Sequence, residues 1–187
     1  AFLGPPEAFF FRGTHLLIAM VLTFLIFPGF RKGSRTTPGL IDLGLLALSC
    51  LTIGYLWANH NYLYDRFVFV DDLRPPDLVL GTIFILLVLE ATRRCIGLAM
   101  PLTALSFVVY ALFFTNVRPE SLIEVNYLTT EGIFGIPLSV SATYVILFIL
   151  FGAFVERSGT GKLFMDSSMS VAGHTAGGPA KVAVITS

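Results

Sequence analysis

Long uncharged, apolar runs alternate with short clusters of charged residues along this chain. The uncharged runs cover residues 13–30, 43–64, 95–117 and 132–155, and each is 18 to 24 residues long. A helix needs about 20 mainly apolar residues to cross about 30 Å of hydrocarbon. In lipid every backbone N–H and C=O must also be satisfied within the segment, which a helix achieves. The pattern therefore predicts one membrane-spanning helix in each run.

A fifth apolar run, residues 78–89, is too short to span unless it continues through Glu90. Arg93 and Arg94 follow three and four residues later, on the same helix face, so this carboxylate can be paired rather than bare. With that extension the chain is predicted to be all-α, a polytopic helical membrane protein. Its five expected spans are residues 14–30, 41–57, 78–96, 101–114 and 137–155.

The segments outside the spans carry weaker patterns. Residues 118–131 place Leu122, Val125 and Leu128 at helical spacing, which predicts a short helix on the outer surface, facing lipid or protein. The tail after Lys162 is assigned no helix until residues 179–187. That last stretch opens with a proline, which suits a first helical turn, so a sixth helix is expected to start there.

Composition agrees with a membrane protein. The chain has 187 residues, a mean hydropathy of +0.82 and 13% charged residues, whereas soluble domains carry about 25%. Membrane lipid is therefore the expected surrounding. The formal net charge of zero gives no reason to expect a nucleic-acid partner.

The sign of the charge alternates from one connection to the next. Arg31, Lys32 and Arg35 occupy the first connection without any acid, and Lys and Arg are retained on the cytoplasmic side of membranes. The second connection is rich in aspartate, so it is predicted outside, together with residue 1. Because the sequence has no initiator Met and no basic leader region, we expect an upstream helix to be missing.

No catalytic, cofactor or metal site is predicted, and the chain is not expected to be an enzyme. His15, His60 and His174 fall on alternating sides of the membrane, so we interpret them as interfacial or packing residues. A membrane enzyme would need more polar residues at depth. Residues 158–162 are similar to a phosphate-binding loop, but Glu156 replaces the first glycine and a span precedes it instead of a strand.

Hydroxyl side chains follow a Gly/Pro break at the start of the last span. Ser141 and Thr143 come shortly after Gly135 and Pro137. Such hydroxyls can bond carbonyls of their own helix, or they can line a pathway for an ion or a carboxylate. Lys181, in a second Gly/Pro turn, is either an inner anchor or part of a gate.

Four segments carry a family resemblance. They are residues 131–144 (EGIFGIPLSVSATY), 150–159 (LFGAFVERSG), 177–184 (GGPAKVAV) and 89–94 (LEATRR). Together they resemble the fused membrane subunit of TRAP transporters, the tripartite ATP-independent periplasmic transporters, of the type that works with a TAXI-class binding protein. Residues 89–94 resemble an inner turn of the small-subunit portion.

The resemblance implies a bacterial or archaeal inner-membrane symporter. Such a protein takes a carboxylate-type organic solute from its periplasmic binding protein and moves it inward with sodium ions by an elevator-like motion. It implies a small-subunit-like bundle over residues 1–117 and the truncated start of a large permease domain over residues 118–187. The Gly/Ser-rich hairpin with most ion ligands, and hence the sodium site, is expected after residue 187.

The resemblance also marks individual positions. Ser141, Thr143, Thr186 and Ser187 become candidates for the transport pathway. The motif residues to which we assign structural roles are Glu90, Arg93, Arg94, Gly135, Pro137, Gly178, Pro179 and Lys181. A non-transporting membrane scaffold or anchoring subunit stays open as the alternative, because these spans carry no charge at mid-depth.

Overall fold

The structure of the chain is a computed structural model that describes residues 8–27, 39–115 and 117–172, together with residues 180 and 184. All regular structure within these residues is helical. The predicted all-α class is thus confirmed. The chain divides into two compact units, residues 1–142 and 143–187, and each is described by itself.

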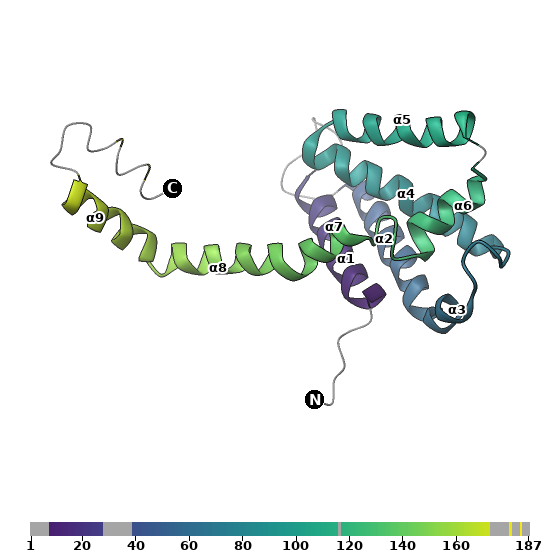
Figure 1. Cartoon of the computed structure of the whole chain (residues 1–187), viewed down its shortest axis with the longest axis horizontal. Coiled ribbons are helices and arrows are strands. Elements are labelled where there is room, and N and C mark those ends of the chain that lie inside the picture. The colour runs from purple at the N-terminus through teal and green to yellow at the C-terminus, as the bar shows by residue number, and fades with distance from the viewer. Residues whose placement is uncertain (1–7, 28–38, 116, 173–179, 181–183, 185–187) are drawn as a thin grey trace. The chain divides into compact units, whose positions relative to one another are not determined.

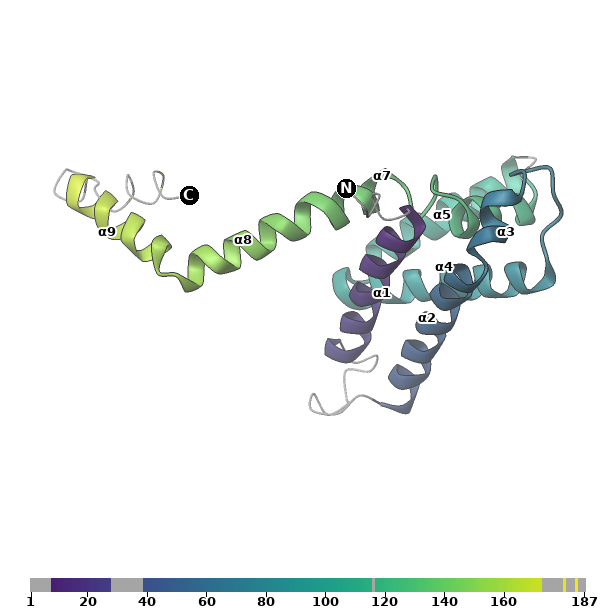
Figure 2. The same ribbon diagram turned by 90° about the horizontal axis from the view of Figure 1, so that it is seen from below.

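The first unit is built on three helices that contact one another (Figures 1 and 2), with α4 crossing α1 and α2 at an angle in the view of Figure 2. These are α1 (Ala8–Ile26), α2 (Leu40–Ala58) and α4 (Pro75–Ile96). The short α3 (His60–Asp65) follows α2. After α4 the chain turns at Gly97, whose φ of 97° suits glycine, and α5 (Ala99–Phe114) packs against α4.

The remainder of the first unit folds onto this bundle. It consists of α6 (Pro119–Ile123), the π-helical turn η1 (Glu124–Leu128) and α7 (Ile136–Val140). The predicted outer helix over residues 118–131 is therefore an α-helical turn followed by a π-helical one, and it ends at Leu128. Leu128 is 4% exposed and belongs to the core, so it faces protein rather than lipid.

The core lies where α1, α2 and α4 meet α6, η1 and the turn before α7. Its fully buried side chains include large apolar and aromatic groups, namely Met20, Phe24, Ile53, Phe84, Tyr127 and Phe134. They also include two small polar residues of α2, Ser49 and Thr52. Small and hydroxylated residues let membrane helices approach closely, because packing and hydrogen bonds drive their association in lipid.

The second unit begins within the π-helical turn η2 (Ser141–Val145) and continues as α8 (Ile146–Arg157) and α9 (Thr160–Ala172). Gly159, with φ of 75°, separates α8 from α9. The apolar pattern predicted no helix over residues 163–172, and this prediction was wrong. That prediction relied on uncharged apolar runs, whereas α9 mixes apolar residues such as Leu163 and Met165 with serines and charged residues.

Among the described residues, three helical stretches are long and apolar enough to cross a membrane. They are α1, α2 and the run Ile136–Arg157, which joins α7, η2 and α8. The shorter α5 is also apolar, and α4 carries its charges near its two ends. α1 begins six residues before the predicted start of the first span. The helix therefore includes Arg12, which stands just before the uncharged run of residues 13–30.

Candidate functional site

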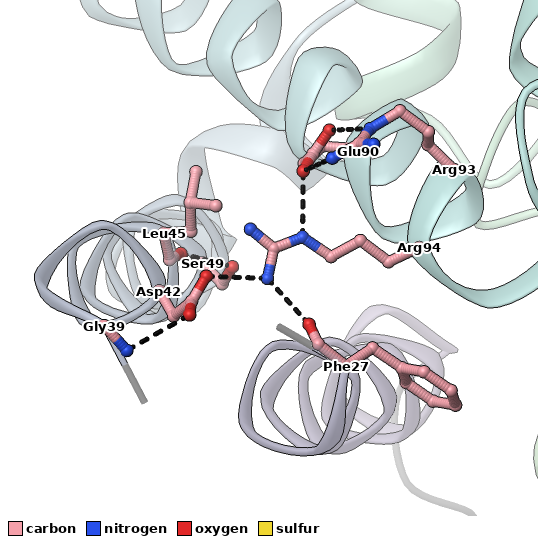
Figure 3. Close-up of polar contacts among 8 residues, drawn as sticks. All are labelled: Phe27, Gly39, Asp42, Leu45, Ser49, Glu90, Arg93 and Arg94. Carbon is pink, nitrogen blue, oxygen red and sulfur yellow. Dashed lines mark hydrogen bonds and ion pairs between the residues drawn. The ribbon is translucent and has the colours of Figure 1, made fainter. Parts of the chain in front are cut away.

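One polar junction ties three helices together at the carboxyl end of α4. The Arg94 side chain is 3% exposed, and its Nη1 donates to Asp42 Oδ1 at 2.8 Å and to the Phe27 carbonyl at 2.9 Å (Figure 3). Its Nε donates to Glu90 Oε1 at 2.8 Å. One guanidinium thus joins α4 to α2 and to the residue that follows α1. We call these four residues the Arg94 junction.

Glu90 is held by both neighbouring arginines, which is the pairing that their spacing predicts. Arg93 binds it through Nε and Nη2, each at 2.7 Å, and Arg94 adds a third bond (Figure 3). The side chains of Arg93 and Glu90 remain 38% and 28% exposed. Removal of one partner of this half-exposed pair should therefore cost less than removal of one partner of a buried pair.

Asp42 and Asp77 occupy equivalent positions in α2 and α4. Each is the third residue of its helix. There Asp42 accepts a bond from Gly39 N at 3.2 Å, and Asp77 accepts one from Arg74 N at 3.1 Å. A carboxylate in the first turn also suits the positive end of the helix dipole. Each aspartate further binds the last turn of the other helix, so α2 and α4 are fastened at both ends.

At the second end, the fully buried Asp77 binds two tyrosines. Tyr55 Oη donates to its Oδ1 at 2.7 Å, and Tyr62 Oη donates to its Oδ2 at 2.9 Å. The guanidinium of Arg74 lies 3.7 Å from the centroid of the Tyr62 ring. Burial, and then the hydrogen bond and charge of Asp77, raise the pKa of Tyr62, so its hydroxyl stays protonated as a donor. We call Asp77, Tyr55 and Tyr62 the Asp77 junction.

A third polar contact joins the loop after α3 to η1. Arg66 Nη2 lies 2.9 Å from Glu124 Oε1, and the two side chains are 3% and 5% exposed. Glu124 Oε1 also accepts from the Phe69 amide at 3.0 Å. Phe69 has a φ of 64°, in the left-handed region that a bulky side chain rarely adopts. The ion pair therefore helps to hold this loop in a strained conformation.

Two buried aromatic rings anchor the segment between α5 and α7. Tyr127 donates its hydroxyl to the Thr52 carbonyl of α2 at 2.7 Å. Phe134 stacks on Phe84 of α4 with ring centroids 5.3 Å apart, and Phe84 also contacts Tyr127 at 5.2 Å. Gly81 of α4 makes room for Tyr127, because a Cβ there would lie 3.1 Å from its Cδ1. These rings fix where the chain enters α7.

The Gly/Pro break before α7 depends on close backbone contacts. A Cβ on Gly132 would collide with the Val125 carbonyl, and one on Gly135 would lie 2.8 Å from the Gly132 carbonyl. Pro137 lies in the first turn of α7, where its missing N–H is not needed. The helix then changes from α to π at Ser141, and π turns recur at functional sites.

Two side chains of α1 reach this break. Arg12 Nη1 donates to the Phe134 carbonyl at 2.6 Å, and His15 Nε2 lies 3.0 Å from Ser141 Oγ. The ring of His15 thus makes a polar contact with a distant segment, and its interpretation as an interfacial or packing residue stays a prediction. Only the fold places these residues together, since they lie more than a hundred positions apart in the chain.

The other predicted site residues fall in different places. Thr143 is half-buried in η2 and belongs to the second unit. Five further residues lie outside the described residues, namely Gly178, Pro179, Lys181, Thr186 and Ser187. The expected sixth helix also lies outside them, except for residues 180 and 184. The pathway roles of Ser141 and Thr143 stay predictions.

The residues that fasten the bundle were not predicted from the sequence. Asp42 and Asp77 each stand three positions after a helix cap, Gly39 and Arg74, and an acid at this spacing is a recognisable start signal. That signal could have located the helix starts. It could not have paired Asp77 with Tyr55, because they lie 22 positions apart on different helices.

The geometry is that of a fastened bundle beside a helix break. Within the part of the chain that the structure describes, no group of three or more His, Cys, Asp or Glu side chains could hold a metal ion. The buried carboxylates bind arginines, tyrosine hydroxyls and backbone amides instead. These contacts fix helix ends and shape the entry to α7.

Comparison with known proteins identifies the family. The model for the DctM component of tripartite ATP-independent periplasmic transporters matches residues 83–187, more than half of the chain. The match covers most of α4 and everything after it, including the Gly/Pro break and η2. No curated protein and no solved structure matches the chain. The chain therefore belongs to the DctM-component family of these TRAP transporters and is a membrane permease component of such a transporter.

Proposed function

We propose that this permease imports a carboxylate-type organic solute across the bacterial or archaeal inner membrane, driven by an ion gradient. The family match over residues 83–187 is the observation that carries the proposal. The family is one component of a tripartite periplasmic system, so we propose a soluble periplasmic binding protein, of the TAXI class, as its partner. Sodium is proposed as the coupling ion.

The contacts of the first unit support a bracing role for α1, α2 and α4. α2 and α4 are fastened at one end by Asp42 and Arg94 and at the other by Asp77 and Tyr55. Buried, charge-assisted contacts of this kind oppose sliding of one helix along another. A bundle that resists sliding suits the fixed part of a transporter, against which other helices move.

The three buried acids among the described residues of the first unit are poorly suited to bind a carboxylate solute. Asp42 and Glu124 are buried and already paired with arginines, and Asp77 is enclosed by tyrosines. An anionic solute beside them would be repelled. We propose, as the family resemblance implies, that the sodium and solute sites lie after residue 187, with Ser141 and Thr143 near the pathway.

The boundary between a small-subunit-like portion and a large permease portion is proposed at residue 117. Contacts of α4 with α6 and η1 cross this position, as would be needed for one portion to brace the other. The orientation proposed from the loop charges places residue 1 and the loop after α3 on the outer side.

Uptake by the full-length permease tests the proposal. The protein would be reconstituted in liposomes with its purified binding protein and offered a panel of radiolabelled C4 to C6 carboxylates. We expect uptake of at least one acid with an inward sodium gradient, and loss of uptake when potassium replaces sodium or when the binding protein is omitted. ATP inside or outside the vesicles should have no effect.

Three outcomes would contradict this proposal. Uptake that persists without a sodium gradient would refute sodium coupling, and uptake that follows ATP hydrolysis would refute secondary transport. A protein that binds its partner but moves no acid under any gradient would support the non-transporting scaffold that the sequence left open. Empty liposomes and the binding protein alone serve as controls for leakage and sequestration.

A further inference from the structure

Arg12 and His15 lie three positions apart on α1, which places them on one face of that helix. Both side chains reach the same distant segment, Arg12 at Phe134 and His15 at Ser141. The Phe134 ring also packs against this face, 5.6 Å from the ring centroid of Phe9. One face of α1 therefore contacts both sides of the Gly/Pro break.

The Phe134 carbonyl needs a donor from outside its own segment. It precedes Gly135, whose carbonyl accepts the first bond of α7, from Ser139 N at 3.1 Å. The Phe134 ring is fully buried, and an unpaired carbonyl in a buried or lipid environment is costly. Arg12 supplies the donor at 2.6 Å, with a charge-assisted bond. This contact fixes the residue before the break.

Ser141 is the first residue of the π turn, and the division between the two compact units falls inside that turn, after Ala142. A serine hydroxyl in a helix ordinarily bonds back to the carbonyl four residues earlier, which bends the helix locally. Here the hydroxyl lies 3.0 Å from His15 Nε2. The histidine competes with back-bonding and ties the start of the turn to α1.

We propose that Arg12 and His15 are positioning residues, which hold the Gly/Pro break and the π turn at Ser141 in place for transport. Neither residue needs to touch the solute. His15 acts through Ser141, and Arg12 acts through the Phe134 carbonyl. The importance of this role for transport rests on the proposed function, whereas the contacts themselves can be tested without any solute.

Hydrogen–deuterium exchange on the full-length protein in nanodiscs provides the solute-free test. The variants are His15→Leu, Ser141→Ala, the double variant, and His15→Gln, whose amide can still bond the hydroxyl. We expect each of the first two to speed amide exchange in residues 141–146 about fivefold, the effect of losing one ordinary hydrogen bond. Amide exchange in the double variant should be no faster than in either single variant. In His15→Gln the exchange rate should stay within twofold of the rate in the parent protein.

Thr14→Val is the matched control, because Thr14 is exposed and its hydroxyl bonds the Phe10 carbonyl of its own helix. It should leave this exchange unchanged. Arg12→Met should speed exchange in residues 135–139, on the other side of the break. Unchanged exchange in His15→Leu and Ser141→Ala, or strictly additive effects in the double variant, would overturn the proposal.

Uptake of the labelled carboxylate then tests the link to transport. We expect His15→Leu to lower the maximal rate at least threefold with KM changed less than twofold, and His15→Gln to restore the rate. If a variant merely unfolds, its uptake rate should fall in proportion to the amount of folded protein. Fluorescence size-exclusion chromatography measures that amount. If exchange responds as expected but the uptake rate does not, the positioning role in transport is refuted while the contacts stand.

Discussion

At the scale of single residues, the buried charges of this protein act as fasteners between helix ends. Arg94 bonds two carboxylates and one carbonyl from three different helical segments. A buried pair of this kind contributes little net stability against an apolar replacement of both partners, but removal of one partner leaves the other bare. The effect of a substitution therefore depends on which partner is left behind.

Arg94→Met should destabilise the protein by about 3 to 5 kcal/mol, because it removes the guanidinium that balances the charge of the buried Asp42. Arg94→Lys should recover only part of this loss, since an ammonium cannot reproduce the fork of the guanidinium. The denaturation midpoint in detergent, followed by circular dichroism, measures both. Arg93→Met is the control, with an expected cost of about 1 kcal/mol or less because that side chain is partly exposed. Equal losses in the Arg93 and Arg94 variants would contradict this account.

Glu124→Ala should cost about 3 to 5 kcal/mol for the same reason, because Arg66 would be left buried and unpaired. Arg66 Nη2 would keep its bond to the Asp71 carbonyl, but among the described residues Nε and Nη1 have no hydrogen-bond partner, so the carbonyl alone would compensate little of the buried charge. The strained loop at Phe69 should also loosen and become sensitive to limited proteolysis. Glu120→Ala provides the comparison: its side chain is 47% exposed and 3.7 Å from an exposed arginine, and it should change neither stability nor cleavage.

At the scale of elements, glycines set how closely the segment after α5 can approach the bundle. Gly81 lets α6 and η1 pack directly on α4, and Gly132 lets the chain fold back against η1. Short π turns at Glu124 and Ser141 then adjust the direction of the helices. A π turn widens the hydrogen-bond pattern and re-aims the side chains that follow.

Gly81→Ala should destabilise the protein by about 1 to 3 kcal/mol, because the added Cβ would lie 2.5 Å from Ile123 Cγ2 and force a shift at the helix contact. Gly54→Ala is the matched control in α2, where a Cβ would meet nothing within 4 Å. It should be neutral or stabilise by about 1 kcal/mol through helix propensity. The denaturation midpoints of both variants in detergent measure these effects. If the Gly81 variant is as stable as the Gly54 variant, the packing of α6 and η1 on α4 at Gly81 is not tight.

At the scale of the whole molecule, α2 and α4 run in opposite directions and are fastened at both ends. If the two ends face opposite sides of the membrane, the Arg94 junction is on the inner side and the Asp77 junction on the outer side, as the loop charges predict. The loop after α3 would then be exposed to the outside.

Cysteines introduced at Ser34 and Asp72 should be labelled from opposite sides of the membrane. Asp72 is exposed, and its connection is predicted outside, whereas Ser34 belongs to the basic connection predicted inside. The native Cys50 and Cys95 are free and exposed, so both need replacement by serine first. A membrane-impermeant maleimide on spheroplasts should label position 72 alone, and label position 34 only after lysis. Labelling of both positions from one side would contradict the predicted orientation.

The sequence by itself determined the class of this protein and the approximate position of its helices. Apolar runs of 18 to 24 residues have few alternatives in a membrane, because a backbone in lipid must satisfy its own hydrogen bonds. The pairing of Glu90 with Arg93 and Arg94 was equally predictable, since it depends only on helical spacing. The motifs around Gly135 identified the family for the same reason, as they are contiguous in the chain.

The tertiary structure alone decided which distant residues meet. Nothing local connects Asp42 with Arg94, Asp77 with Tyr55, or His15 with Ser141, because each contact requires two helices to pack in one register. The same register explains why α1 continues through Arg12, whose charge finds a buried carbonyl. A hydropathy pattern shows where a charged residue stands in the chain. The free-energy cost of burying that charge depends on the partner that the fold supplies.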